Sequence, residues 1–163
     1  MAKDLETRDL KTRDGRLGYA VVRVVLGVNL TMHGVSRFLM GPGEFGFKLQ
    51  TQFAHSPLPA KFVWAFGTML PGIEALLGVL ILFGLRTRAA LVGAGMLMAV
   101  LTFGVCLIQD FAAAGLQLTY AVVIAGLVAL VRYNGWSVDA AMGVRGQVTA
   151  PDERVQVPFG DGG

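Results

Sequence analysis

The stretch of sequence that decides the fold is residues 89–108, which read AALVGAGMLMAVLTFGVCLI and contain no charged side chain. An α-helix of about 20 apolar residues can cross a hydrocarbon core of about 30 Å. Three more runs on either side of it have the same character, namely residues 17–40, 62–85 and 111–131. Four such runs leave too little polar sequence to cover them in water. We therefore predict an all-α protein in which residues 17–142 form a four-helix transmembrane bundle.

The composition excludes several classes of protein. Charged residues make up 15% of the chain, against roughly 25% in soluble domains, so water is not its main solvent. The single cysteine excludes an intrachain disulfide, a Cys-x-x-Cys redox pair and a zinc or iron–sulfur site held by cysteines of one chain. The two histidines are too few for an all-histidine metal site. We therefore expect no metal.

The distribution of lysine and arginine predicts the orientation in the membrane. Ten of these residues lie within residues 1–16, at the connection 86–88 or after residue 131, whereas Arg37, Lys48 and Lys61 lie on the other side. Because the cytoplasmic side carries the positive excess, both termini are predicted to be cytoplasmic. The formal net charge of +3 is then a topology signal, and no nucleic-acid partner is expected. Membrane lipid is the partner that the composition implies.

The segments outside the four spans differ in character. Residues 1–16 are predicted to be a cytoplasmic segment, and the apolar run after them is too long for a cleaved signal peptide. Residues 41–61 form a predicted exterior loop, which is either a lid or docking surface or simply slack between spans. The loop contains a Gly-x-Gly-x-x-Gly pattern, but the pattern follows a membrane helix, so no nucleotide is expected. Residues 143–163 form a polar tail that we expect to be disordered.

Polar side chains are concentrated on one face of the first span. At 100° per residue, Arg23, Asn29, His33 and Arg37 fall on a stripe about 120° wide, which must face the bundle interior. In the second span Glu74 lies near the middle of the bilayer, where an isolated carboxylate is costly. We predict a buried Arg23–Glu74 ion pair, with Asn29 as a further hydrogen-bond donor. The pair either takes part in chemistry or only fixes how the two helices pack.

His33 has two interpretations. It is either a hydrogen-bonded residue near the membrane interface, or a proton acceptor and a donor to a quinone carbonyl. A bis-histidine haem is excluded because the other histidine, His55, lies in the predicted loop. Four polar residues bracket the exterior end of the last two spans, where they can close a cavity inside the bundle: Gln109, Asp110, Gln117 and Tyr120. The alternative for Gln109 and Asp110 is that they anchor the chain at the membrane interface. Five glycines are predicted to allow close helix packing: Gly27, Gly34, Gly72, Gly78 and Gly93.

Short motifs in a fixed order resemble the DoxX family of small four-helix bacterial membrane proteins, over about residues 16–142. The matching pieces are Arg23 with Gly27, His33-Gly34-x-x-Arg37, Ser56-Pro57-Leu58-Pro59, Pro71-x-x-Glu74-x-x-x-Gly78, Leu85-Arg86-Thr87-Arg88 and Gly135-Trp136-Ser137-Val138-Asp139. Arg37 stands where many members of that family have lysine, and the charge is kept.

The resemblance implies a multi-pass subunit of a quinone-linked oxidoreductase or electron-transport assembly in the bacterial inner membrane, of which the thiosulfate:quinone oxidoreductase type is the best known. His33, Glu74 and Arg23 are then the expected catalytic residues. The quinone is expected to bind to Asn29, His33, Arg37 and Tyr120, with no metal, haem or nucleotide. The expected partners are other membrane subunits or further copies of the chain. The alternative is an accessory or assembly subunit that packs against a larger complex and performs no chemistry.

Overall fold

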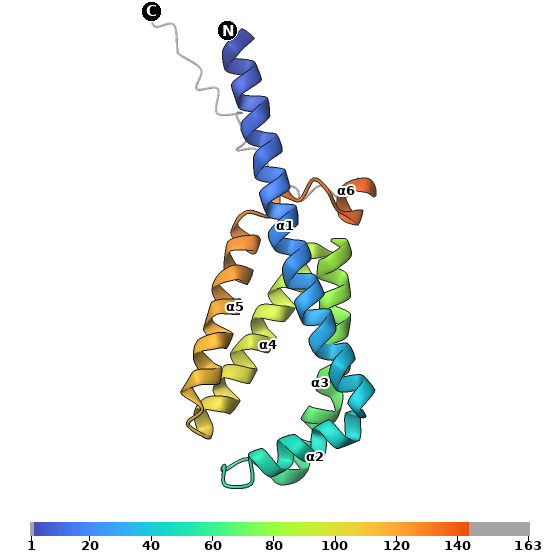
Figure 1. Cartoon of the computed structure of the whole chain (residues 1–163), viewed down its shortest axis with the longest axis vertical. Coiled ribbons are helices and arrows are strands. Elements are labelled where there is room, and N and C mark those ends of the chain that lie inside the picture. Colours follow the sequence, from blue (N-terminus) through green and yellow to red (C-terminus); the bar gives the residue numbers. More distant parts are fainter. Residues whose placement is uncertain (1, 144–163) are drawn as a thin grey trace, which may run out of the picture.

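The computed structural model describes residues 2–143, and in it the chain is helical (Figure 1). The elements are α1 (Ala2–Met40), α2 (Pro42–Gln52), α3 (Ala60–Phe83), α4 (Thr87–Leu107), α5 (Phe111–Ala129), a 3₁₀ turn η1 (Val131–Tyr133) and α6 (Val138–Ala141). Four helices are long and apolar enough to cross a membrane: α1 from Leu10 onward, α3, α4 and α5. The all-α prediction with four candidate spans is therefore confirmed. The disorder predicted for the polar tail concerns residues that lie almost entirely outside the described ones.

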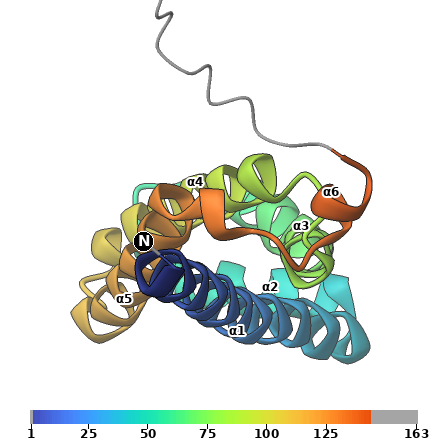
Figure 2. The ribbon, with the colours of Figure 1, turned by 90° about the horizontal axis from the view of Figure 1, so that it is seen from above.

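The spans form two antiparallel pairs. Helix α1 packs along α3, and α4 packs along α5, while α2 lies across the end where α1 and α3 are joined (Figures 1 and 2). Helices α1 and α5 lie close together at the end of the bundle opposite α2, and they diverge toward α2 (Figure 1). The start of α1 and the end of α5 lie at the same end of the bundle. The side of the membrane that this end faces stays a prediction.

Glycines set how α1 and α3 pack. A Cβ added at Gly27 would lie 2.6 Å from the backbone of Leu82, and one added at Gly34 would lie 2.6 Å from the carbonyl oxygen of Pro71. Both distances are too short for any side chain, so the two backbones touch at these points. The contacts run in one antiparallel register: Gly27 with Leu82, Thr31 with Gly78, and Gly34 with Ala75.

The packing predicted for glycines is thus confirmed at Gly27, Gly34 and Gly78. At Gly93 an added Cβ would lie 3.1 Å from a side-chain carbon of Leu77, so that position is tight as well. The prediction is wrong at Gly72, where an added Cβ would have no neighbour within 4 Å. Gly72 therefore faces outward, and its presence in α3 has no packing reason in this structure.

The region predicted as an exterior loop contains the helix α2. Gly41 has φ of 102°, a conformation that glycine adopts easily, and Pro42 then occupies the first turn of the helix, where its missing N–H costs nothing. The buried Gly46 lets α2 lie directly on α3, because a Cβ there would be 2.7 Å from the carbonyl oxygen of Trp64. The prediction of a plain loop is wrong for residues 42–52, because Gly41 and Pro42 start a helix there and Gly46 packs it on α3.

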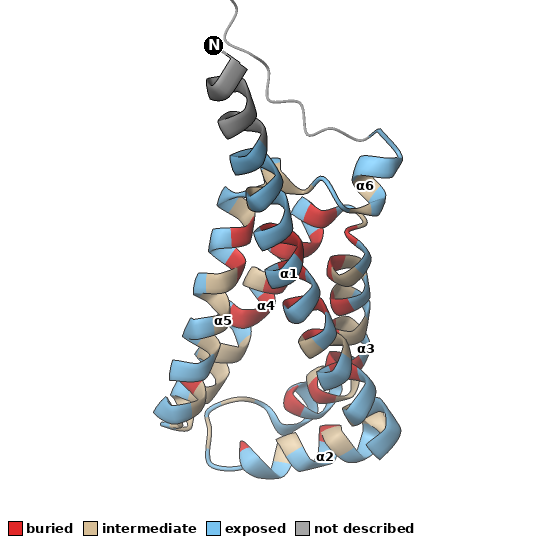
Figure 3. Ribbon diagram, turned by 45° about the horizontal axis from the view of Figure 1, so that its top comes forward, coloured by how far each residue is buried: buried red, intermediate tan, exposed pale blue. Residues whose placement is uncertain are grey.

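Burial follows the helix interfaces (Figure 3). The core cluster lies where the four spans meet and includes Leu26, Ile81, Leu91 and Ile124. The outward faces are apolar as well, with Met96 68% and Val122 72% exposed. In water such faces would associate, whereas in a bilayer they meet lipid tails.

Candidate functional site

The polar face predicted for α1 lines a cavity between the two helix pairs. This polar cavity has a volume of about 230 Å³, and Asn29, His33 and Arg37 lie along its α1 side. Gln117 and Tyr120 line it from α5. Helix α3 contributes Glu74. The structure therefore brings together six of the polar residues that the sequence singled out.

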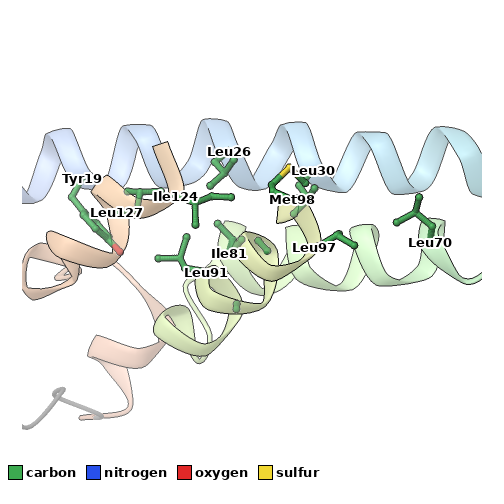
Figure 4. Packing of buried hydrophobic residues seen from close by; sticks show 12 residues of the cluster. Tyr19, Leu26, Leu30, Leu70, Ile81, Leu91, Leu97, Met98, Ile124 and Leu127 are labelled. Atoms are coloured by element: carbon green, nitrogen blue, oxygen red, sulfur yellow. The ribbon is translucent and has the colours of Figure 1, made fainter. Parts of the chain in front are cut away.

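Apolar side chains form the rest of the lining. Leu26 and Leu30 from α1, Met98 from α4 and Ile124 from α5 belong both to this lining and to the buried core, where they meet between the helices (Figure 4). His33 and Leu116 line the cavity and are nevertheless exposed, so the cavity opens between α1 and α5. Both helices are candidate spans, so the opening lies between two helices that can cross a membrane.

Several polar groups of the cavity have no protein partner within the described residues. Gln117 Oε1 is buried and accepts no hydrogen bond there. The side chains of Asn29, His33 and Tyr120 also make none within residues 10–143. Buried polar groups in proteins almost always have a partner. A cavity that gathers several unpaired donors and acceptors on apolar walls is suited to a ligand with a polar head.

Arg37 and Glu74 form the ion pair of the cavity. Arg37 Nη1 donates to Glu74 Oε1 at 2.5 Å and also contacts Oε2. The Glu74 side chain is 4% exposed, and that of Arg37 is 27% exposed. The guanidinium carbon of Arg37 also lies 4.8 Å from the centre of the Phe45 ring, which α2 supplies. The pair therefore joins α1, α2 and α3 at the edge of the cavity.

The predicted Arg23–Glu74 pair is wrong. In the observed register of α1 against α3, Glu74 lies level with about residue 35. At 1.5 Å per residue that is about 3 Å from Arg37 along the helix axis but about 18 Å from Arg23. The prediction fails because the contacts of Gly27, Thr31 and Gly34 set the register of α1 against α3.

Arg23 lies instead at the α3–α4 turn, outside the polar cavity. It is 3% exposed, and its Nη1 donates to the carbonyl oxygens of Ile81 and Leu82, each at 2.6 Å. Its Nη2 donates to the carbonyl oxygen of Trp136 at 2.7 Å. The last carbonyls of a helix lack intrahelical partners, so Arg23 satisfies the end of α3 and fixes the segment after α5 to it. This position gives Arg23 a structural role.

Asp139, which no sequence pattern marks as functional, acts at the same turn. Its carboxylate accepts from the backbone N–H of Arg86 at 2.7 Å, and from the N–H and hydroxyl of Thr87, both at 2.8 Å. Asn134 Nδ2 also donates to the Thr87 hydroxyl oxygen at 2.8 Å. Asp139 therefore caps the start of α4 from far along the chain. No local pattern signals such a cap.

The other polar residues at the α4–α5 connection are structural. Asp110 accepts from Ala113 N at 3.0 Å and so caps α5, and Gln109 has φ of 59° in the turn before it. Neither lines the polar cavity. In the part of the chain that the structure describes, no three His, Cys, Asp or Glu side chains lie together as metal ligands would.

Comparisons with known proteins give one result. The model of the family described as "Methylamine utilisation protein MauE" matches residues 16–115. The match covers α2, α3, α4 and most of α1, including His33, Arg37 and Glu74, and it ends before Gln117 and Tyr120. No curated protein and no solved structure matches the chain.

The resemblance to DoxX is therefore wrong, because the family that matches is a different membrane family. Several of the motifs that suggested it are explained by packing and capping. Gly27 and Gly34 let two helices touch, and Asp139 caps the turn at Arg86. Unrelated membrane bundles can use the same residue types for the same purpose. With four candidate spans and a family match over more than half its length, the chain is a multi-pass membrane protein that belongs to the MauE family.

Proposed function

We propose that the protein is a quinone-binding subunit of a redox system that serves methylamine utilisation in the bacterial inner membrane. The name of its family supports the metabolic setting. One observation supports quinone most strongly: polar side chains from α1 and α5 converge in the polar cavity, whose other walls are apolar and which opens between two spans. Quinones dissolve in the hydrocarbon core of the bilayer, so a quinone can enter the cavity directly from there.

The head group fits the chemistry of the lining. A quinone ring is flat and apolar on its faces and carries two carbonyl acceptors at opposite edges. Leu30 and Met98 offer apolar surface for the faces, while His33, Asn29 and Tyr120 offer donors for the carbonyls. Gln117 Oε1, which lacks a donor within the described residues, can accept from a hydroxyl once the ring is reduced to quinol.

Reduction of a quinone to a quinol takes up two electrons and two protons. Imidazole exchanges protons readily, which suits His33 at the mouth of the cavity. Glu74 is the buried carboxylate of the same cavity and is held by Arg37, so it can take a proton when the ion pair opens. We assign the electrons to a separate donor, which is another subunit or a diffusible redox protein.

This function requires protein partners as well as lipid. The electron donor must dock near the cavity, and other membrane subunits or a second copy of the chain are the expected neighbours. The exposed apolar faces of the four spans are suited to lipid and to neighbouring spans alike. No nucleic acid and no metal ligand forms part of the proposal.

The experiment that tests the proposal uses the two histidines of the chain. The purified protein in lipid nanodiscs is titrated with a short-chain ubiquinone by calorimetry. His33→Phe keeps an aromatic ring of similar size and removes both nitrogens, so it should weaken binding by up to about tenfold through the loss of one hydrogen bond to the quinone. His55→Phe is the matched control, because His55 is exposed in the segment after α2 and lies outside the polar cavity. This variant should bind quinone as the wild type does.

Two results would contradict quinone binding. One is the absence of saturable binding to the wild-type protein, and the other is an equal effect of the two histidine changes. In either case the accessory function takes its place: the protein would then support the assembly of a larger complex, and His33→Phe would leave the electron-transfer rate per assembled complex unchanged.

A further inference from the structure

A second cavity, which we call the apolar chamber, lies beside the first. It has a volume of about 330 Å³ and lies between the end of α2, the start of α3 and the last turns of α4. Aromatic and aliphatic side chains dominate its lining, among them Phe53, Leu58, Phe66 and Phe103. Gln52 supplies its only polar side chain within the described residues. An apolar lining of this kind favours an apolar occupant.

The chamber and the polar cavity share one lining residue, Leu101 of α4. Met98, one turn before it, belongs to the polar cavity, and Val105, one turn after it, belongs to the chamber. The two cavities therefore follow each other along about 10 Å of α4. A polar space and an apolar space in this order match a molecule with a polar head and a linear apolar chain.

We propose that the apolar chamber holds the isoprenoid chain of the quinone whose head group occupies the polar cavity. This inference rests on the proposed function. It adds that the site prefers quinones whose chain has a few isoprene units. The cavity volumes agree with this proposal. Common small-molecule sites have roughly 300–1,000 Å³; the polar cavity alone is smaller than that, whereas the polar cavity and the chamber together fall in that range.

Gly104 keeps the chamber open. A Cβ added there would lie 3.4 Å from the ring of Phe53, which is ordinary contact, so the backbone itself has room for a larger residue. The atoms beyond Cβ of a larger side chain would occupy the space of the chamber. Gly126 on α5 offers a matched position, since it is exposed, lies outside both cavities, and an added Cβ there meets nothing within 4 Å.

The test compares two quinones with one head group, bearing one and three isoprene units. Binding of each quinone to the full chain is measured for the wild type, Gly104→Leu and Gly126→Leu. All three proteins are held in nanodiscs of the same lipid composition, so the partition of a quinone into the lipid is the same for each of them. Gly104→Leu should weaken binding of the three-unit quinone by about fivefold or more through lost packing contacts, while it changes binding of the one-unit quinone less than twofold. Gly126→Leu should change neither.

The outcomes separate this inference from the proposed function. If the wild type does not bind the one-unit quinone, the proposed function fails. If it does, and Gly104→Leu affects both quinones equally or neither, only the chamber assignment is overturned.

A measurement on the wild type covers the case in which Gly104→Leu does not fold. A three-unit quinone with a diazirine at the chain end should label peptides within residues 49–66 or 100–105. Labelling confined to α5 or to other outer faces would overturn the inference. A photoreactive phospholipid gives a second check. If it labels the same peptides and the quinone does not displace it, the chamber is a lipid site and the inference is overturned.

Discussion

Removing the guanidinium of Arg37 should destabilise the protein more than removing the negative charge of Glu74. The carboxylate of Glu74 is 4% exposed, so Arg37→Leu leaves an almost fully buried charge without a partner. Such a loss costs roughly 3–5 kcal/mol in soluble proteins. In Glu74→Gln the unpaired group is Arg37, which is 27% exposed and still lies over the Phe45 ring, so we expect a smaller cost of about 1–2 kcal/mol.

These differences are large enough for thermal unfolding in detergent. At roughly 2–4 °C per kcal/mol for a chain of this size, Arg37→Leu should lower Tm by roughly 6–20 °C and Glu74→Gln by roughly 2–8 °C. The double variant should be more stable than Arg37→Leu alone, because no buried charge is left unpaired.

Arg23 supplies the control for this cycle. It lies about 18 Å from Glu74 along the helix axis, so the effects of Arg23→Leu and Glu74→Gln should add to within about 0.5 kcal/mol. A coupling between Arg23 and Glu74 that equals or exceeds the coupling between Arg37 and Glu74 would refute the register of α1 against α3. So would a larger loss for Glu74→Gln than for Arg37→Leu.

Three further predictions concern packing, capping and topology. Gly34→Ala should lower stability by about 1–3 kcal/mol in thermal unfolding because its Cβ would overlap the backbone of α3, whereas Gly72→Ala should be neutral or slightly stabilising; equal losses would contradict the α1–α3 contact. Asp139→Ala removes the cap of α4 and should cost about 1–2 kcal/mol by the same assay, and an unchanged Tm would show that the cap contributes nothing. In a Cys106→Ser background, a cysteine at Ser56 should react with an impermeant maleimide in intact cells, and labelling only after permeabilisation would reverse the predicted orientation.

Helix content and the main polar face could be predicted from sequence because both depend on local periodicity. The start and end of α3, α4 and α5 lie within two residues of the predicted spans 62–85, 89–108 and 111–131. The stripe of Asn29, His33 and Arg37 also follows from 100° per residue, and these side chains do share one cavity.

Features that depend on contacts between helices could not be predicted in the same way. Whether Glu74 meets Arg23 or Arg37 depends on how far α1 slides along α3, and backbone contacts at glycines decide this. Asp139 caps a helix more than 50 residues earlier in the chain, so no local pattern reveals it. The start of α2 does carry a local signal: a glycine precedes a proline, and an acidic residue follows in the first turn. The same residues are also common in loops, and from sequence alone the segment is therefore expected to be a loop.

The most direct test of quinone binding is an experimental structure of the protein in nanodiscs with a short-chain quinone added. If the polar cavity binds quinone, density for the ring will lie between α1 and α5, with the ring oxygens within hydrogen-bond distance of His33 and of Tyr120 or Gln117. Ring density at any other place, or a polar cavity filled by a lipid tail at saturating quinone, would contradict it.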